Sequence, residues 1–575
     1  MRAWIPVALA VANAAGAQAP AAPPSDSALT ARVNQYLSRI ADRGYAGGVL
    51  VRRSGRTLLA RSYGLANREA GIRADANTVY NIGSITKQFT AAAILRLEEL
   101  GKLRTTDSIA RFFPKAPADK RAITLHQLLT HTAGFESDYS PGDYEPNTRD
   151  EYVGRMFAKP LRTPPGAAHH YANSGYSMLA AIVEIVTGKD YESALRELVL
   201  LPAGMRETGY AAPRWAPNRV AHGYQAGRDW GTIVERIAVP GAPFWALRGN
   251  GGLHTTLADM ALWDDALNDR RMLTDSSRRK FMTGYVNEGP DGRSQYAYGW
   301  AVMRTPRGTR LVTHNGGNGV YVAELLRYVD EGVTIFLTST VAEQPASPVV
   351  NVLARIAFGT PYELPPERAA AAPADIAALT GAFTLRDGSR LTLRADGARL
   401  TAEAVGQQAF QFLAAGDTTS PPDASTLNAR ALAAAQGAVR GDIRALRVAL
   451  GPGAPDSASV AQQEAEMMQG RLGRFGEFRS VEVLGTSRGP GGMRRTTVRL
   501  NFARGGATNV YVWGPDGFIE DIEARPYAPS ELVPTGPGEF RAMDPRTGGS
   551  ATIRVRDGAV ALQAPSGAVT VTRVP

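Results

Sequence analysis

A serine and a lysine stand three residues apart at the start of an apolar stretch, in NIGSITKQFTAAAIL at residues 81–95. If this stretch is a helix, the side chains of Ser84 and Lys87 lie one turn apart on one face. A serine becomes a nucleophile when a base takes its proton, and a partly buried lysine, unlike an arginine, can lose its own proton and serve as that base. The pair therefore predicts covalent catalysis, with two polar residues at an ordinary helix start as the alternative.

The Ser-x-x-Lys spacing is a weak signal by itself, because Ser277 and Lys280 repeat it in SSRRK. This second match lies in a charged stretch suited to solvent, whereas Ser84 directly precedes a long apolar segment. The context therefore favours Ser84 and Lys87.

A serine–lysine site needs a second proton carrier. At pH 7, forming neutral lysine from its ordinary pKa costs about 4.6 kcal/mol and forming tyrosinate costs about 4 kcal/mol, so each group must be tuned by burial or by the other's charge. Tyr171 and Asn173 supply a phenol and an amide in a turn between a Pro-Pro-Gly sequence and an apolar segment. Tyr285 and Asn287 repeat that spacing, but they follow the charged SSRRK stretch closely.

The sequence His314-Asn315-Gly316-Gly317 ends a strand-like stretch. At such a point the chain can present a backbone N–H to a developing oxyanion, and the glycines permit close approach.

The elements that must position these residues show both strand and helix patterns. Apolar runs around Ser54-Gly55 predict a β-hairpin, and the strand-like runs before and after Asp330-Glu331-Gly332 are joined by so few residues that they must be antiparallel. We expect a mixed domain at 28–362, with an antiparallel sheet built from both chain ends and a largely helical middle. The predicted strands lie in 49–64, 309–317, 321–329 and 333–340, and the predicted helices run from the opening stretch to Gly101 and over 123–132, 174–188 and 346–358.

The C-terminal part begins with a linker rich in proline and alanine at 363–375. Beyond it, LTLRADGARL and ATIRVRDGAVAL both read as strand, Asp-Gly turn, strand. They bracket a segment with a helical part and then strands. We therefore expect a discontinuous β-barrel at 376–424 and 528–575, interrupted by an α+β insertion at 425–527.

The N-terminal residues 1–17 have one arginine, an apolar run and small residues, which predicts a signal peptide cleaved after Ala17. An uncleaved anchor is the alternative. A cleaved signal makes the protein periplasmic or secreted, and no later apolar run is long enough to span a membrane.

The composition excludes several classes of site and partner. The chain has no cysteine, which excludes disulfides and thiolate metal sites. The net charge of +10 comes from scattered arginines without a nucleic-acid motif. His126, His131, His169 and His170 have no carboxylate at ligand spacing, so we expect no metal and favour packing or capping roles.

Several motifs in order give residues 28–362 a family resemblance. They are SITK, ITLHQLLTHTAGF, PPGAAHHYANSGYSMLAAIVEIVTGKDYE, LPAGMRETGY, GNGGLHTTLADMALW, YGW and HNGG. Together they resemble the serine β-lactamase and penicillin-binding-protein superfamily, in its class C β-lactamase-like branch of hydrolases. The resemblance implies an α+β fold, with an antiparallel sheet flanked by helices and a largely helical second lobe, and no cofactor.

The resemblance also implies roles for individual residues. Ser84 would be the acylated nucleophile, Lys87 its general base or the group that tunes it, and Tyr171 a proton shuttle. Asn173 would contact Lys87 and the substrate. His314 and Gly316 match the first and third positions of the family's Lys-Thr-Gly element, and the N–H groups of Ser84 and Gly317 would form the oxyanion hole.

The sequence departs from the family at His314, where β-lactamases and D,D-peptidases usually carry lysine. Histidine is mostly neutral near pH 7, so it is less suited to binding a substrate carboxylate. We therefore expect an exported serine hydrolase acting on an ester or a D-amino-acid peptide, with weak β-lactamase activity as an alternative. Further alternatives are a non-catalytic sensor of peptidoglycan or β-lactams and a structural envelope protein; the oligomeric state stays open.

The C-terminal part resembles the lipocalin-like accessory domains that follow such hydrolases, and its insertion resembles a nuclear-transport-factor-like fold. Neither contains a catalytic combination of residues, so a stabilising or substrate-gating role is the expectation.

Overall fold

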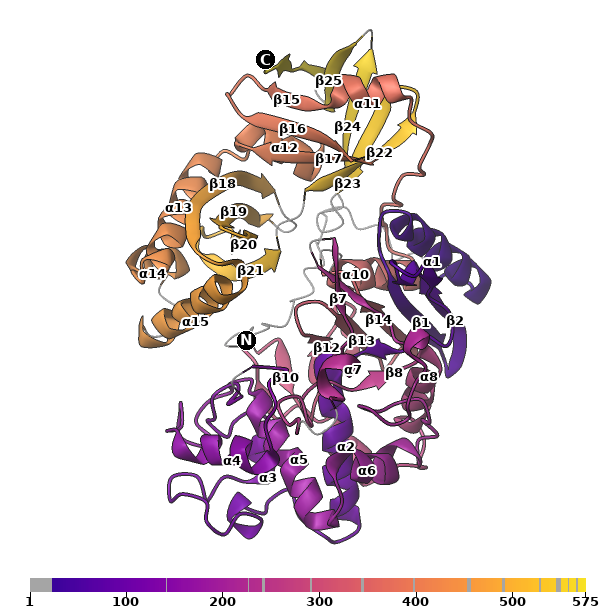
Figure 1. Ribbon diagram of the computed structural model, residues 1–575, viewed down its shortest axis with the longest axis vertical. Helices are drawn as coiled ribbons and strands as arrows, with labels where there is room; N and C mark the ends of the chain where they lie inside the picture. Colours follow the sequence, from indigo (N-terminus) through magenta and orange to yellow (C-terminus); the bar gives the residue numbers. More distant parts are fainter. Residues whose placement is uncertain are drawn as a thin grey trace. The chain divides into compact units, whose positions relative to one another are not determined.

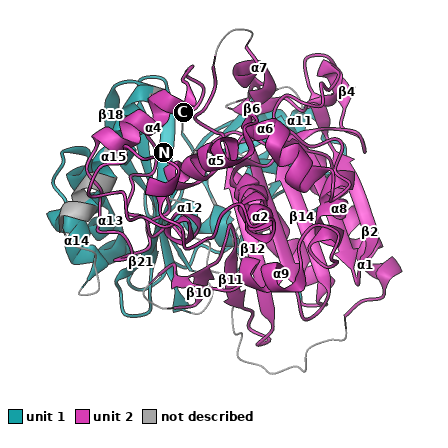
Figure 2. Ribbon diagram, turned by 90° about the horizontal axis from the view of Figure 1, so that it is seen from below, with its two compact units in different colours: residues 1–21, 361–575 teal, residues 22–360 magenta. Residues whose placement is uncertain are grey.

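The computed structural model describes residues 23–574, except for short segments, and divides the chain into two compact units. The N-terminal unit spans Ala22–Thr360, and the C-terminal unit contains the chain from Pro361 onward (Figure 2). The predicted signal peptide at 1–17 lies outside the described residues. The segments left out are 141, 226, 240–242, 290–291, 343–345, 397–398, 452–456, 489–491, 527–528, 544–549, 557 and 565–566.

An eight-stranded antiparallel sheet forms the N-terminal unit's centre, in the order β2-β1-β14-β13-β12-β11-β10-β9 (Figure 1). Its first strand pairs with its last along the chain, with Val49 opposite Leu337, so the prediction of a sheet built from both chain ends is confirmed. The strands are β1 Gly47–Arg53, β2 Arg56–Tyr63, β9 Val286–Asn287, β10 Ser294–Tyr296, β11 Ala301–Arg304, β12 Arg310–Gly317, β13 Val322–Tyr328 and β14 Val333–Ser339.

Helices cover both faces of this sheet. On β13, Arg327 binds Asp264 of helix α8 (Leu257–Ala266), whereas Glu324 binds Ser347 of helix α10 (Ala346–Ala357). Side chains an odd number of positions apart on a strand point to opposite faces, so α8 and α10 lie on opposite sides. Helix α1 (Asp26–Ala41) packs against β2 and α10.

The remaining elements of the unit form its helical middle and short two-stranded ribbons. They include α2 Thr86–Glu99, α3 Leu125–Leu129, α4 Arg149–Ala158, α5 Asn173–Thr187, α6 Tyr191–Leu195, α7 Ile233–Ile237, α9 Asp275–Phe281, β3 Leu65–Asn67, β4 Ile72–Arg73, β5 Tyr80–Asn81, β6 Gly223–Gln225, β7 Arg228–Gly231 and β8 His254–Thr255, with a 3-10 turn, η1, at Gly83–Ile85.

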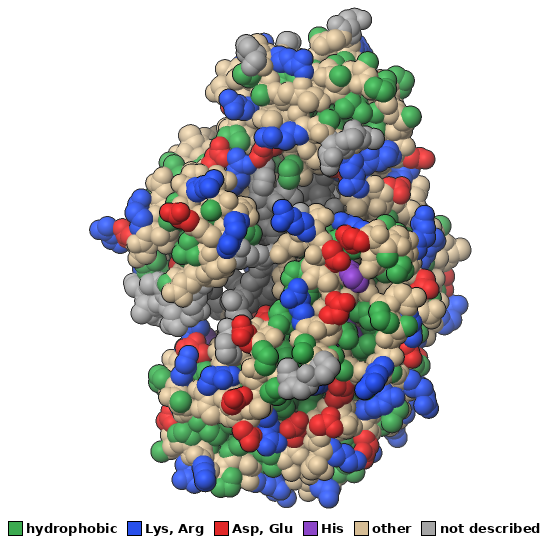
Figure 3. Space-filling view, in the orientation of Figure 1, with side chains coloured by type: hydrophobic (Ala, Val, Ile, Leu, Met, Phe, Trp, Pro, Cys, Tyr) green, Lys and Arg blue, Asp and Glu red, His purple; other side chains and the backbone are tan. Residues whose placement is uncertain are grey.

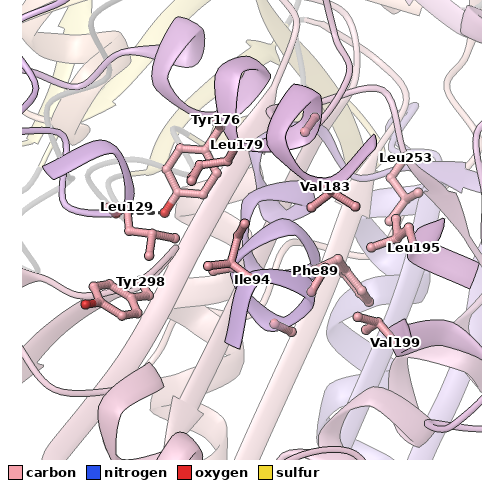
Figure 4. Close-up of a cluster of buried hydrophobic side chains, with 14 of the residues drawn as sticks. Phe89, Ile94, Leu129, Tyr176, Leu179, Val183, Leu195, Val199, Leu253 and Tyr298 are labelled. Atoms are coloured by element: carbon pink, nitrogen blue, oxygen red, sulfur yellow. Dashed lines mark hydrogen bonds between the residues drawn. The ribbon is translucent and has the colours of Figure 1, made fainter. Parts of the chain in front are cut away.

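Helix α2 lies within the apolar core of the unit. Residues from Thr86 to Leu95 are all buried, which is the pattern of a helix surrounded by protein on every side. Phe89 and Ile94 of α2 pack among apolar side chains of α3, α5 and neighbouring segments (Figure 4). The buried cluster around them includes Leu129, Tyr176, Leu179, Val183, Leu195, Val199, Leu253 and Tyr298.

The C-terminal unit contains a nine-stranded antiparallel sheet in the order β26-β25-β24-β23-β22-β17-β16-β15-β27. The two edge strands, β26 and β27, are separated in the chain by Val571 alone, so the sheet curls until its edges are joined by the chain. The strands are β15 Gly381–Thr384, β16 Arg390–Asp396, β17 Arg399–Val405, β22 Ser530–Gly536, β23 Glu539–Met543, β24 Ser550–Arg556, β25 Ala559–Ala564, β26 Gly567–Thr570 and β27 Thr572–Arg573, and the helices are α11 Pro373–Leu379 and α12 Gln407–Ala415.

A separate α+β group lies in the chain between β17 and β22, which pair directly with Leu400 opposite Leu532. It has its own apolar core, which includes Ala431 and Trp513. Its sheet order is β18-β19-β20-β21. Its elements are α13 Ala424–Val439, α14 Arg444–Leu450, α15 Ser457–Phe475, β18 Phe478–Arg488, β19 Arg494–Phe502, β20 Gly505–Trp513 and β21 Ile519–Pro526.

The predicted fold class is confirmed, with an antiparallel sheet flanked by helices and a β-rich C-terminal unit. In the part of the chain that the structure describes, no helix is long and apolar enough to cross a membrane. Basic and acidic side chains are intermixed on the face shown in Figure 3.

Candidate active site

Ser84 lies in the turn η1, immediately before α2. Two hydrogen bonds fix the backbone of this turn: the Gly83 N–H donates to Oδ1 of Asn81 at 3.0 Å, and Nδ2 of Asn81 donates to the Leu253 carbonyl at 3.2 Å. Gly83 has a φ of +49°, a conformation that favours glycine. Ser84 is partly exposed, whereas its neighbours Gly83 and Ile85 are buried.

The amine of Lys87 is fully buried and has three oxygen atoms around it. Nζ lies 2.9 Å from Oγ of Ser84, 2.8 Å from Oδ1 of Asn173 and 2.9 Å from the carbonyl oxygen of Asn250. Burial lowers the pKa of Lys87 well below its ordinary value, and the negative charge of Asp138 opposes this shift.

These contacts match the hydrogen-bonding capacity of a neutral amine. The oxygens of Asn173 and Asn250 can only accept, whereas the Ser84 hydroxyl can also donate. A neutral lysine has two N–H donors and one lone pair, so both N–H groups are used and the lone pair remains for the Ser84 proton. This arrangement is suited to a general base.

Tyr171 stands at the start of α5, two residues before Asn173, and is partly exposed. Nζ of Lys87 lies 4.7 Å from the centre of its ring. Burial raises the pKa of Tyr171 above its ordinary value, and a hydrogen bond with Ser84 opposes that shift. The phenol therefore keeps its proton at neutral pH.

The end of β12 contacts the nucleophile turn backbone to backbone. A Cβ atom on Gly316 would lie 2.8 Å from the backbone nitrogen of Ser84. A Cβ atom on Gly83 would lie 2.4 Å from the backbone nitrogen of Gly317. The strand end thus brings Gly317 beside the turn that carries the nucleophile.

His314 is 5% exposed, and both of its ring nitrogens have partners within the protein. Nε2 lies 3.0 Å from the hydroxyl of Tyr296, and Nδ1 lies 2.5 Å from the carbonyl oxygen of Asn315. Burial is the main cause that lowers the pKa of His314, to about 3. The imidazole is therefore neutral and is not available as a cation.

All seven residues singled out in the sequence come together at this place, namely Ser84, Lys87, Tyr171, Asn173, His314, Gly316 and Gly317. The second Ser-x-x-Lys match is engaged differently. Lys280 donates to Glu98 at 2.8 Å, so its amine has a carboxylate partner. Tyr285 donates its hydroxyl to the Lys280 carbonyl.

Sequence reasoning missed two residues that contact the site, Asn250 and Tyr296. The Asn250 carbonyl receives a hydrogen bond from Lys87, and the Asn250 amide is held by Ser177 and Ala246 at 2.8 and 2.7 Å. Tyr296 binds His314. Asn250 lies within the motif GNGGLHTTLADMALW, and Tyr296 lies two residues before the motif YGW. A backbone acceptor or an inward tyrosine has no signature in one sequence.

His131 was expected to have a packing or capping role, and its contacts are of both kinds. Its Nδ1 accepts from the Ala172 N–H at 3.1 Å, and its ring lies 4.3 Å from that of Tyr171. Among the described residues, no group of three or more His, Asp or Glu side chains could hold a metal ion.

The chain is similar to known proteins over most of its N-terminal unit. The family model described as Beta-lactamase matches residues 33–359. The chain is 26% identical over 398 residues to Penicillin-binding protein 4* of Bacillus subtilis (strain 168), which covers 65% of this chain and 87% of that protein. It is 32% identical over 223 residues to Esterase EstB of Burkholderia gladioli, which covers 35% of this chain and 56% of that protein.

A solved structure has a similar fold over nearly the whole chain. The octameric penicillin-binding protein homologue from Pyrococcus abyssi aligns with a TM-score of 0.53 at 18% identity, covering 94% of this chain and 99% of that one. At this identity the likeness concerns the fold alone.

Proposed function

The chain belongs to the β-lactamase family of serine hydrolases, and we propose from this premise that it cleaves an ester or amide bond through a covalent acyl-enzyme on Ser84. The observation that carries the proposal is the buried Lys87, whose two fixed acceptors, Asn173 and Asn250, leave its lone pair for the Ser84 hydroxyl.

In the first step, Nζ of Lys87 takes the Ser84 proton as Oγ attacks the carbonyl carbon of the substrate. The carbonyl oxygen becomes an oxyanion, which the backbone N–H groups of Ser84 and Gly317 stabilise. The N-terminal end of α2 adds a favourable positive potential at the same point.

Lys87 and Tyr171 have pKa shifts in opposite directions, which supports a different proton transfer for each residue. Burial favours the neutral amine of Lys87 and the neutral phenol of Tyr171. Lys87 then acts as the base for acylation, while Tyr171 gives a proton to the leaving group and recovers it from Lys87. Water then attacks the acyl-enzyme and releases the acid and the free Ser84 hydroxyl.

The environment of His314 favours neutral ester substrates and D-amino-acid amides. Its imidazole is uncharged and engaged on both nitrogens, so it offers no cation to a substrate carboxylate of the kind found in β-lactams and in D,D-peptides. The relative named Esterase EstB is consistent with ester chemistry. The signal-like residues 1–17 support action in the periplasm or outside the cell.

A substrate panel tests the proposal, with p-nitrophenyl esters, D-aminoacyl amides and nitrocefin assayed on the wild type, Ser84→Ala and the control Ser277→Ala. We expect turnover of at least one ester or amide, its loss in Ser84→Ala and its retention in Ser277→Ala. Turnover that survives in Ser84→Ala would overturn the mechanism. No turnover, together with no labelling of Ser84 by a fluorophosphonate, would favour a non-catalytic binding protein.

A further inference from the structure

We infer that Tyr296 and His314 are positioning residues for the oxyanion hole, which they hold in place through the carbonyl of Asn315. This inference rests on the proposed function, in which the Gly317 N–H stabilises the oxyanion. It gives the histidine of the HNGG sequence a role inside the protein rather than toward the substrate.

The Tyr296 hydroxyl, the His314 imidazole and the Asn315 carbonyl are joined by two hydrogen bonds, in which each donor is followed by its acceptor. The Asn315 carbonyl can only accept, so Nδ1 of His314, 2.5 Å away, carries the proton. A neutral imidazole then has a lone pair on Nε2, which accepts from the Tyr296 hydroxyl at 3.0 Å. The Asn315 carbonyl therefore selects the tautomer of His314, and the Tyr296 hydroxyl holds the other ring nitrogen in place.

The end of β12 needs the restraint from Tyr296 and His314, because the pairing of β12 with β11 ends before the residues of the site. β11 pairs with β12 from Arg310 to Thr313, and the pairing ends where Ala301 lies opposite Thr313. On the other side, β13 pairs with β12 as far as Gly317, opposite Val322. Residues 314–317 are therefore held by a strand on one side, and the Tyr296–His314 pair supplies a restraint that does not depend on β11.

The carbonyl that His314 holds lies one peptide before the Gly316–Gly317 peptide, whose N–H faces the oxyanion in the proposed function. Gly316 has no side chain to anchor it, and a Cβ atom there would lie 2.0 Å from the Ile82 carbonyl oxygen. Rotation of the Asn315 carbonyl would thus turn the following peptide against the nucleophile turn. A small tilt of a hydrogen-bond donor away from the oxyanion weakens the stabilisation of the transition state.

Packing holds the Tyr296 ring in one position, so its hydroxyl can restrain His314. It is 1% exposed, and its ring packs against His131 at 4.6 Å, His169 at 5.6 Å and Tyr171 at 6.1 Å between ring centres. These contacts hold the ring itself, so replacing Tyr296 by phenylalanine removes the hydroxyl and keeps the packing.

Four variants test the inference. His314→Leu removes both ring nitrogens, whereas His314→Asn places an amide N–H near the position of Nδ1. Tyr296→Phe removes the hydroxyl that binds Nε2. Tyr298→Phe is the matched control, because the Tyr298 hydroxyl lies 2.8 Å from Nδ1 of His126 in a second tyrosine–histidine pair, which is partly buried.

We expect kcat for a neutral ester to fall about 30-fold in His314→Leu and about 5-fold in Tyr296→Phe, with KM changed less than about 3-fold. His314→Asn should recover most of the loss, and Tyr298→Phe should match the wild type. The rate of labelling by a fluorophosphonate should fall in parallel, since its tetrahedral adduct uses the same N–H groups. Melting temperatures confirm that each variant is folded.

The outcomes separate this inference from the proposed function. A wild type that is not labelled at Ser84 contradicts the proposed function itself. A labelled wild type whose Tyr296→Phe and His314→Leu variants react at the same rate overturns the inference alone. Equal losses in Tyr296→Phe and Tyr298→Phe, or a loss that appears only in KM, would assign a packing or substrate-binding role instead.

Discussion

A Cβ atom on Gly316 would lie 2.0 Å from the carbonyl oxygen of Ile82, so the end of β12 and the nucleophile turn meet backbone to backbone. Ile82 and Gly316, which are more than 230 positions apart in the sequence, are thereby in direct contact at the site. No side chain fits between them, so the two N–H groups of the proposed oxyanion hole belong to stretches of backbone in direct contact.

Replacing Gly316 by alanine should therefore lower kcat/KM by at least about 100-fold. The added methyl group must push the strand end away from Ser84, because its nearest neighbours are backbone atoms. Gly154→Ala is the control, since Gly154 lies in helix α4 and a Cβ atom there meets nothing within 4 Å. Steady-state kinetics on the preferred ester compare the two, and equal activity in both would contradict this account of the strand end.

Lys87→Arg should lose about 1,000-fold in acylation rate, because arginine keeps its charge and cannot act as a base. In the wild type, burial lowers the pKa of Lys87 well below its ordinary value, so the neutral base forms at a lower pH than it would in an exposed lysine. The acylation rate should rise with pH through this lowered pKa and then level off. Stopped-flow measurement of the acylation burst gives both results.

The control for this change is Lys280→Arg, because Lys280 is paired with Glu98 and needs only its charge. Its acylation rate should stay within about 3-fold of the wild type. An active Lys87→Arg variant, or an acylation rate that falls as the pH rises from 5 to 8, would exclude Lys87 as the base.

A carboxylate on the substrate should not raise kcat/KM. His314 has a pKa near 3 and is neutral throughout the working range, so it does not attract an anion. We expect an ester with a terminal carboxylate to have a lower kcat/KM than its methyl ester, with a ratio that stays constant between pH 5 and 9. A preference for the carboxylate that disappears as the pH rises would show that His314 is charged when substrate binds.

The parts of the site that could be predicted are those encoded by local patterns. Ser84 and Lys87 lie one helical turn apart, and the apolar residues after them predicted a buried helix, which α2 is. The antiparallel strands near residue 330 followed from their short connections. These features depend on neighbouring residues, so one sequence contains enough information.

The parts that could not be predicted depend on distant residues or on backbone atoms. The third contact of Lys87 is the carbonyl of Asn250, and every residue has a carbonyl. The inward orientation of His314 depends on Tyr296 in another strand. The sequence placed His314 at the site, but its neighbours decide that the ring is buried and neutral.

Glu324 provides a prediction about stability that is independent of the catalytic residues. Its side chain is buried on the α10 face of β13, where it binds the Ser347 hydroxyl, and burial raises its pKa to about 7. The unfolded chain ionises this carboxyl at a pKa near 4.5. Between these two values the unfolded state releases the proton more readily, so stability decreases as the pH rises from about 4.5 to about 7 and the penalty is constant above that.

Glu324→Gln keeps the shape and the partner of the side chain but cannot ionise. The free energy of unfolding of the variant, relative to the wild type, should therefore rise by about 3 kcal/mol between pH 4.5 and 7.5. Urea unfolding of both proteins at several pH values measures this difference. Because the Ser347 hydroxyl lowers the pKa of Glu324, Ser347→Ala should move the same transition to higher pH. A difference that stays flat from pH 4 to pH 8 would mean that Glu324 ionises in the folded protein as readily as in the unfolded chain.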